Sequence, residues 1–293
     1  MKTIISLSIF SFNKSRFSSF KELEEEFKLL QGIKDDYKQA KVYFAVGNDI
    51  TDYSYFGLSV NQQIKNFEFG GDRGLQISFN MKLQREYLKN FDWWSLTTDE
   101  LIEKSVLGPN IENNENHILY MPILKMNGYV GFDNDETFAS HYEKMLSEYP
   151  VSNDSYYQRM TSHFTNIIYH SNCRLTLNSI EGGDFCKFSI AFTRCLKALN
   201  DHKAQIRIPE ELDIIGHLAG YSCTTQGSNN KKNMQFSFPE VSEVNQVNCE
   251  YHLKPSDSND PRDNGYYHNR IYFTFSEIDG EVKTLVASIG PHL

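Results

Sequence analysis

The chain has 293 residues, and its 29 Lys and Arg against 38 Asp and Glu give a formal net charge of −9. This length corresponds to one large domain or two of ordinary size, since a typical domain has about 150 residues. Its 40% hydrophobic and 14% aromatic residues are sufficient for a core, which excludes a wholly disordered chain. The acidic charge argues against a protein that coats nucleic acid non-specifically, because that mode of binding requires a basic surface. A net acidic charge still permits local basic patches.

The cysteines and the apolar runs indicate the compartment. Five scattered cysteines form no C-x-x-C pair, so neither a zinc ribbon nor a dithiol redox motif is indicated. The apolar start, Ile4 to Phe10, imitates a short signal peptide, but its alternation with Ser6 and Ser8 favours a first β-strand. No apolar run reaches the ~18 residues of a membrane span. We therefore expect a cytoplasmic protein without a membrane segment, a metal or a cofactor.

In the first half of the chain, two capping boxes predict helices. Ser19-x-x-Glu22 opens a predicted helix over 19–31, and Thr97-x-x-Glu100 opens one of about ten residues from position 98. Apolar runs predict strands over residues 41–46, 75–79 and 117–125.

The second half begins with predicted helices and ends in predicted strands. Helices are expected over 135–147, 153–170, 187–200 and from Pro209 to Leu218, followed by a polar loop over 222–233. Strands are then expected over 234–238, 249–253, 270–275 and 283–289, with a hairpin turn at Asp279-Gly280. The pattern predicts an α+β protein: a mixed α/β domain over 1–150, and helices followed by a mostly antiparallel sheet over 151–293.

One candidate site emerges from the faces of two predicted strands. In the strand 249–254, alternation places Glu250, His252 and Lys254 on one face, opposite Cys249, Tyr251 and Leu253. In the strand 270–275, Arg270, Tyr272 and Thr274 share a face, opposite an apolar face of Ile271, Phe273 and Phe275. Pairing of the two apolar faces would leave a single polar surface, with His292 at the end of the next strand.

These residue types are the ones that cleave RNA without a metal. Glu250 or His252 would accept the proton of a 2′-hydroxyl, and a second histidine such as His292 would protonate the leaving oxygen. Arg270 and Lys254 would stabilise the charge that develops on the phosphate.

The strings CEYHLK, NRIYFTF and SIGPHL resemble the C-terminal signature of uncharacterised bacterial proteins found among toxin and anti-phage defence genes. Their layout also resembles that of the small metal-independent RNases of the barnase and RelE-toxin type. The resemblance covers roughly the last 60 residues. It implies a nuclease role for His252, Lys254, Arg270, Tyr272 and His292, and a defence or toxin effector as the whole protein.

Other interpretations stay open. The solvated face of any antiparallel strand is polar by default, so alternation alone also predicts such a surface without function. The chain would otherwise be a non-enzymatic sensor or binding subunit that contacts a partner protein or nucleic acid. The most basic stretch includes Lys187, Arg194 and Lys197, which would contact phosphates or simply form a solvated helix face. A polar insertion over 255–269 is expected to form a loop above the proposed face.

Overall fold

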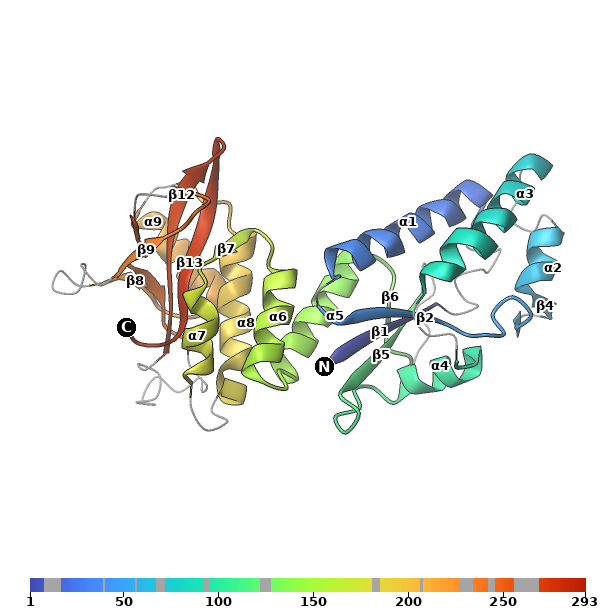
Figure 1. Ribbon diagram of the computed structural model, residues 1–293, viewed down its shortest axis with the longest axis horizontal. Coiled ribbons are helices and arrows are strands. Elements are labelled where there is room, and N and C mark those ends of the chain that lie inside the picture. Colours follow the sequence, from blue (N-terminus) through green and yellow to red (C-terminus); the bar gives the residue numbers. More distant parts are fainter. Residues whose placement is uncertain are drawn as a thin grey trace. The chain divides into compact units, whose positions relative to one another are not determined.

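The computed structural model describes residues 1–7, 17–38, 40–55, 57–66, 72–91, 95–121, 128–180, 185–205, 208–226, 234–241, 246–255 and 269–293. The chain forms two compact units, Met1–Tyr142 and Glu143–Leu293, each with its own core (Figure 1). The division falls inside one helix, α5 (Asp135–Glu148), whereas the sequence-based boundary at residue 150 follows that helix. In the described part of the chain, no helix has both the length and the apolar character needed to cross a bilayer.

The N-terminal unit is built on a parallel sheet of four strands in the order β2-β1-β5-β6. Its elements, in chain order, are β1 (Lys2–Leu7), α1 (Phe20–Asp36), β2 (Val42–Val46), β3 (Ser54–Tyr55), β4 (Leu58–Ser59), α2 (Val60–Lys65), α3 (Arg73–Lys82), the π-helix η2 (Leu83–Tyr87), the 3-10 helix η3 (Leu88–Asn90), α4 (Thr98–Val106), β5 (Glu115–Tyr120) and β6 (Gly131–Phe132).

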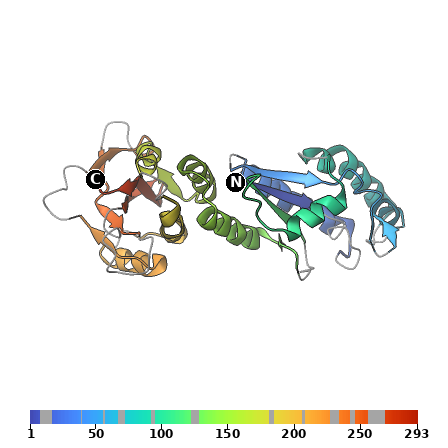
Figure 2. The same cartoon turned by 90° about the horizontal axis from the view of Figure 1, so that it is seen from below.

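Helices cover both faces of this sheet, with α1 and α3 on one side and α4 on the other (Figures 1 and 2). On the α1 side, Ile5 and Phe44 pack against the buried stripe of α1. On the α4 side, Ile4 packs with Leu101. Because both faces of β1 are buried, its residues Thr3 to Leu7 are all shielded from water, as expected for the central strand of a parallel sheet.

Gly47, directly after β2, lets the chain approach the start of α4. A Cβ at this position would come within 2.4 Å of the backbone nitrogen of Thr98. The neighbouring Asp49 accepts hydrogen bonds from the backbone N–H and the hydroxyl of Thr98, both at 2.7 Å. These contacts complete the helix start that the capping box at Thr97 and Glu100 predicted.

The strand predicted over 75–79 is wrong, because these residues belong to helix α3. Asp72 caps that helix by accepting hydrogen bonds from the backbone N–H groups of Gly74 and Leu75. The alternation that suggested a strand does not reflect burial, since Leu75 and Ile77 are about half exposed and Phe79 alone is buried. The other predicted N-terminal elements are confirmed as α1, β2, α4 and β5, except that residues 122–125 of the last lie outside the described residues.

The C-terminal unit combines four further helices with a five-stranded sheet. Its elements after α5 are α6 (Asn153–His163), β7 (Ile167–Tyr169), α7 (Asn172–Asn178), α8 (Phe185–Asp201), α9 (Glu210–Ala219), β8 (Cys223–Thr225), β9 (Gln235–Ser237), β10 (Gln246–Asn248), β11 (Tyr251–Leu253), β12 (Asn269–Ile278) and β13 (Glu281–Pro291). The sheet order is β7-β13-β12-β11-β8, antiparallel except for the pairing of β7 with β13. The fold class is therefore α+β, as predicted.

Each face of this sheet packs against a different layer. On one face, Leu253, Ile271 and Phe273 pack with apolar residues of helices α6 to α9. On the other face, Tyr272 and Leu285 pack with residues of the segment that carries the two-stranded sheet of β9 and β10. The sheet is thus buried on both sides, and the face of Tyr272 is not the solvated surface that alternation predicted.

Two predicted C-terminal elements need correction. The helix predicted over 153–170 ends at His163, and residues 167–169 form β7 instead. The loop predicted over 222–233 contains β8, which pairs with β11. In both cases a partner distant in sequence supplies the hydrogen bonds, and local pattern does not reveal such a partner.

Candidate functional site

The candidate residues meet where β11 and β12 pair. His252 lies directly opposite Tyr272 in the antiparallel ladder, and their ring centroids are 5.4 Å apart. The ring of His292 also contacts Tyr272, edge-on, with a centroid distance of 6.1 Å. The structure therefore brings both histidines to one aromatic ring, which alternation along single strands could not establish.

The face is more buried than its composition suggests. His252 is 4% exposed, Arg270 5% and Tyr272 0%, whereas Glu250 and Lys254 are half-buried and His292 is exposed. The polar group therefore has a buried centre and an accessible side. Residues 256–268, where an overlying loop was predicted, lie outside the described residues.

One side-chain assignment on this face is wrong. Cys249 was expected to share the side of Tyr251 and Leu253, but it packs in the same cluster as Tyr272. The backbone N–H of Cys249 donates to the carbonyl of Met234 at 2.8 Å, and β11 begins only at Tyr251. The alternation of β11 therefore cannot be extended back to Cys249.

His252 is held by hydrogen bonds at both ring nitrogens. Nε2 lies 3.2 Å from the hydroxyl of Thr224 on β8, and Nδ1 lies 3.5 Å from the carbonyl oxygen of Glu250. A neutral ring that donates from Nδ1 accepts the Thr224 hydroxyl at Nε2. Thr224 was not among the predicted residues, because its segment was interpreted as a loop.

The electrostatic environment keeps His252 neutral. Burial lowers the pKa of His252 to about 4, and the nearby positive charges of Lys254 and Arg270 contribute in the same direction, as does His292. Burial also lowers the pKa of Lys254, helped by the charge of Arg270. Burial raises the pKa of Tyr272. At neutral pH, the cluster therefore joins a neutral imidazole to fixed positive charge.

This arrangement suits an anionic ligand that also carries a group able to give up a proton. Arg270, whose Nη1 donates to the carbonyl of Asn269 at 2.7 Å, and Lys254 supply positive charge on the two paired strands. Nε2 of His252, which accepts the Thr224 hydroxyl here, is the nitrogen that can accept a proton when a substrate hydroxyl takes the place of Thr224. Glu250 is the residue just before β11, so the strand pairing does not fix the position of its carboxyl group.

The basic helix face is partly neutralised within the protein. Lys197 on α8 lies 2.7 Å from a carboxylate oxygen of Glu143 and 3.2 Å from one of Asp201. Arg194 is exposed on the same helix, while the side chain of Lys187 lies outside the described residues. Of the two predicted phosphate contacts whose side chains are described, Lys197 is paired with carboxylates and Arg194 is exposed.

The described residues contain no group of three or more His, Cys, Asp or Glu that could hold a metal ion. Comparison with known proteins found no matching family model, curated protein or solved structure.

Proposed function

We propose that the C-terminal unit is a metal-independent RNase whose site is centred on His252, Tyr272, Arg270 and His292. The observation that supports this most is the convergence of two histidines on Tyr272, with Arg270 and Lys254 close enough to lower the pKa of His252. A defence or toxin role for the whole protein is part of the same proposal and depends on the resemblance of its C-terminal strings.

The proposed reaction needs one proton acceptor and one proton donor. His252 takes the proton from a 2′-hydroxyl, and the resulting oxygen attacks phosphorus. The bond from phosphorus to the 5′-oxygen breaks, and the protonated ring of His292 donates its proton to that oxygen. Arg270 and Lys254 stabilise the negative charge that develops on the phosphate oxygens. The products are a 2′,3′-cyclic phosphate and a free 5′-hydroxyl.

The test measures cleavage of a fluorescent RNA in EDTA by the full chain and its variants. We expect His252→Gln and Arg270→Lys to reduce the rate at least about 100-fold, within the range that general acid–base groups contribute. Matched controls are His217→Gln and Arg174→Lys, which change exposed residues elsewhere in the unit. Circular dichroism and the unfolding midpoint confirm that each variant is folded. Cleavage that survives both site variants would overturn the proposal.

A second candidate function is binding without cleavage. The low exposure of His252, Arg270 and Tyr272 speaks against catalysis by these residues, because buried polar groups on a sheet also serve to fix the packing of a core; contact with RNA would then be made by the exposed groups around them. In that case RNA would bind, measured by fluorescence anisotropy, but the wild-type chain would not cleave it. A folded chain that neither cleaves nor binds RNA would exclude both nucleic-acid functions.

A further inference from the structure

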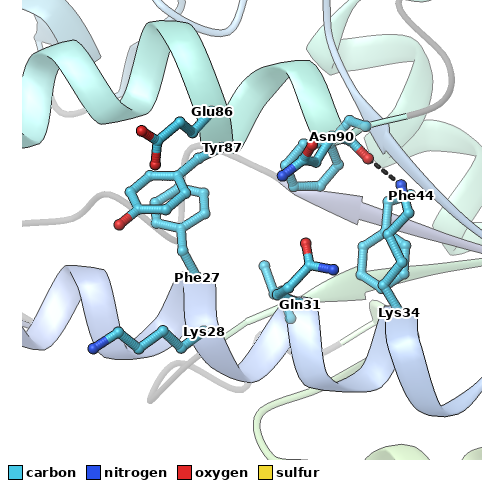
Figure 3. Close-up of a pocket in the computed structure, with 10 residues that line it drawn as sticks. Phe27, Lys28, Gln31, Lys34, Phe44, Glu86, Tyr87 and Asn90 are labelled. Atoms are coloured by element: carbon cyan, nitrogen blue, oxygen red, sulfur yellow. Dashed lines mark hydrogen bonds between the residues drawn. The ribbon is translucent and has the colours of Figure 1, made fainter.

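A groove in the N-terminal unit has the features of a small-molecule site (Figure 3). It lies between α1 and the end of the helical segment that continues α3, and its volume is about 400 Å³. This volume lies within the range of ligand pockets, about 300–1,000 Å³. The groove belongs entirely to the N-terminal unit, so it is independent of the RNase proposal.

The helical segment changes its geometry at the groove. Residues 73–82 form the α-helix α3, residues 83–87 the π-helix η2, and residues 88–90 the 3-10 helix η3. π-Helical turns are rare and are found frequently at functional sites. Here η2 contributes Glu86 and Tyr87 to the groove, and η3 contributes Asn90. The irregular turns thus supply the side of the groove that faces α1.

Aromatic rings form the two ends of the floor. Phe27 of α1 stacks on Tyr87, with centroids 4.4 Å apart and planes within 5°. Phe44 of β2 packs edge-on against Phe91 at 5.9 Å. The phenylalanines are at most 7% exposed in their own core, so the rings are fixed before any ligand arrives. These rings give the groove a rigid apolar floor, against which the apolar edge or face of a ligand ring packs.

Polar side chains line the rim of the groove. The carboxamides of Gln31 and Asn90 point toward the space between the two helical segments (Figure 3). Gln31 donates through Nε2 to Asp35 at 2.9 Å, which directs its carbonyl oxygen to the groove. Lys34 closes one end, where its amine donates to the backbone carbonyl of Asn90 and lies 5.8 Å from the Phe44 ring. Glu86 and Lys28 bring charged groups of opposite sign to the other end (Figure 3).

We propose that this groove binds a nucleobase. A base offers an apolar ring and an edge that both donates and accepts hydrogen bonds, which matches the aromatic floor and the two carboxamides. Lys34 at one end and Lys28 at the other supply positive charge for the phosphate of a nucleotide. Such a base could come from a free nucleotide or from a single-stranded RNA, and the two sources share this chemistry.

The test titrates the full chain with AMP, CMP, GMP, UMP and a short single-stranded RNA in calorimetry. The carboxamide variant is the double change Gln31→Ala with Asn90→Ala, both at exposed positions, and we expect it to weaken binding at least 10-fold. Asn90→Ala keeps the backbone carbonyl that Lys34 uses. Gln84→Ala, an exposed change on η2 outside the groove lining, is the matched control and should leave binding unchanged.

The probes separate the two sources of the base. A free nucleotide that binds and is weakened by the carboxamide variant supports the proposal with a nucleotide as ligand. If the RNA binds, no free nucleotide binds, and the carboxamide variant weakens the binding of the RNA, the proposal is supported with an RNA strand as the ligand. Binding of ribose 5-phosphate as tight as that of the nucleotides, binding unchanged in the carboxamide variant, or no binding of any probe at millimolar concentration would overturn it. All samples carry His252→Gln, so that cleavage of the RNA probe by the C-terminal unit does not affect the binding measurements.

Discussion

His252 and Tyr272 face each other across β11 and β12, with ring centroids 5.4 Å apart and ring planes 43° from parallel. This pair fixes the position of His252 in the sheet and places it away from water. His292 contacts the same tyrosine ring at 6.1 Å. Two histidines in different surroundings, one buried and one exposed, are what an acid and base pair requires.

The first prediction concerns the protonation of His252. Its ring should titrate at about 4 in the folded protein, well below the ordinary value of about 6.5. Two-dimensional NMR of the imidazole signals against pH measures this directly, and His252→Gln identifies the signal. Titration of that signal near 6.5 would show that the ring is not in the buried environment described above.

The same shift makes stability depend on pH in a defined direction. The folded pKa lies below the unfolded one, so the unfolded chain binds more protons between pH 6.5 and pH 4. The free energy of unfolding should therefore fall as the pH is lowered through this window, by at most about 3 kcal/mol from His252. Above pH 6.5, the free energy of unfolding should not depend on the protonation of His252. In His252→Gln this part of the acid dependence should disappear, as measured by urea unfolding at a series of pH values.

The second prediction concerns Arg159, which is 2% exposed. Its guanidinium donates to the carbonyls of Tyr149 and Pro150 at 2.8 and 2.7 Å, and more weakly to those of Met145 and Ser155. These bonds join α6 to the end of α5 and the turn between them. Arg159→Met should lower the free energy of unfolding by about 3 kcal/mol, because four carbonyl groups lose a charged donor.

Arg174→Met is the matched control for this change. Arg174 is exposed and contacts the exposed Asp154 at 3.0 Å, and such surface pairs contribute under about 1 kcal/mol. Denaturant unfolding compares the two variants under the same conditions. Equal losses of stability in the two variants would show that the hydrogen bonds from Arg159 to the four carbonyl groups contribute no more than a surface ion pair.

The third prediction uses the same chemical change at two glycines. Gly47→Ala should destabilise the N-terminal unit by several kcal/mol, at the upper end of what single substitutions cause, because the new Cβ would overlap the Thr98 nitrogen. Gly32 lies inside α1 with nothing within 4 Å of a new Cβ. Gly32→Ala should instead stabilise by about 0.5–1 kcal/mol. Thermal unfolding of both variants tests the opposite signs, and an unchanged or raised unfolding temperature in Gly47→Ala would contradict the packing described at Gly47.

Much of the fold could be predicted from local signals. The N-cap at Ser19, the capping box at Thr97, the closing Gly220 of α9 and the turn at Asp279-Gly280 all lie where the sequence placed them. At Ser19 the reciprocal half of the predicted box is absent, because the Glu22 carboxylate accepts from the backbone N–H of Ser18. Each of these signals acts within a few residues, so it needs no knowledge of distant partners. The error at 75–79 shows the limit, because apolar alternation outweighed the capping residue Asp72 that starts α3.

The candidate site could be predicted only in part. The residue types and the opposite faces of β12 followed from alternation, and the packing of Ile271 and Phe273 confirms that division. The burial of Tyr272 and the contact of His252 with Thr224 depend on β8 and on the segment with β9 and β10. These elements are short and pair over long distances, which leaves no local pattern to find them.

The most direct test of the RNase proposal is the identity of the ends made from a defined RNA in EDTA. The wild-type chain should produce 2′,3′-cyclic phosphate ends, measured by mass spectrometry, and should fail at a single position that carries a 2′-deoxy sugar. His252→Gln should form these ends at least about 100-fold more slowly. Absence of cleavage by a folded wild-type chain, or cleavage that continues at the 2′-deoxy position, would contradict the account.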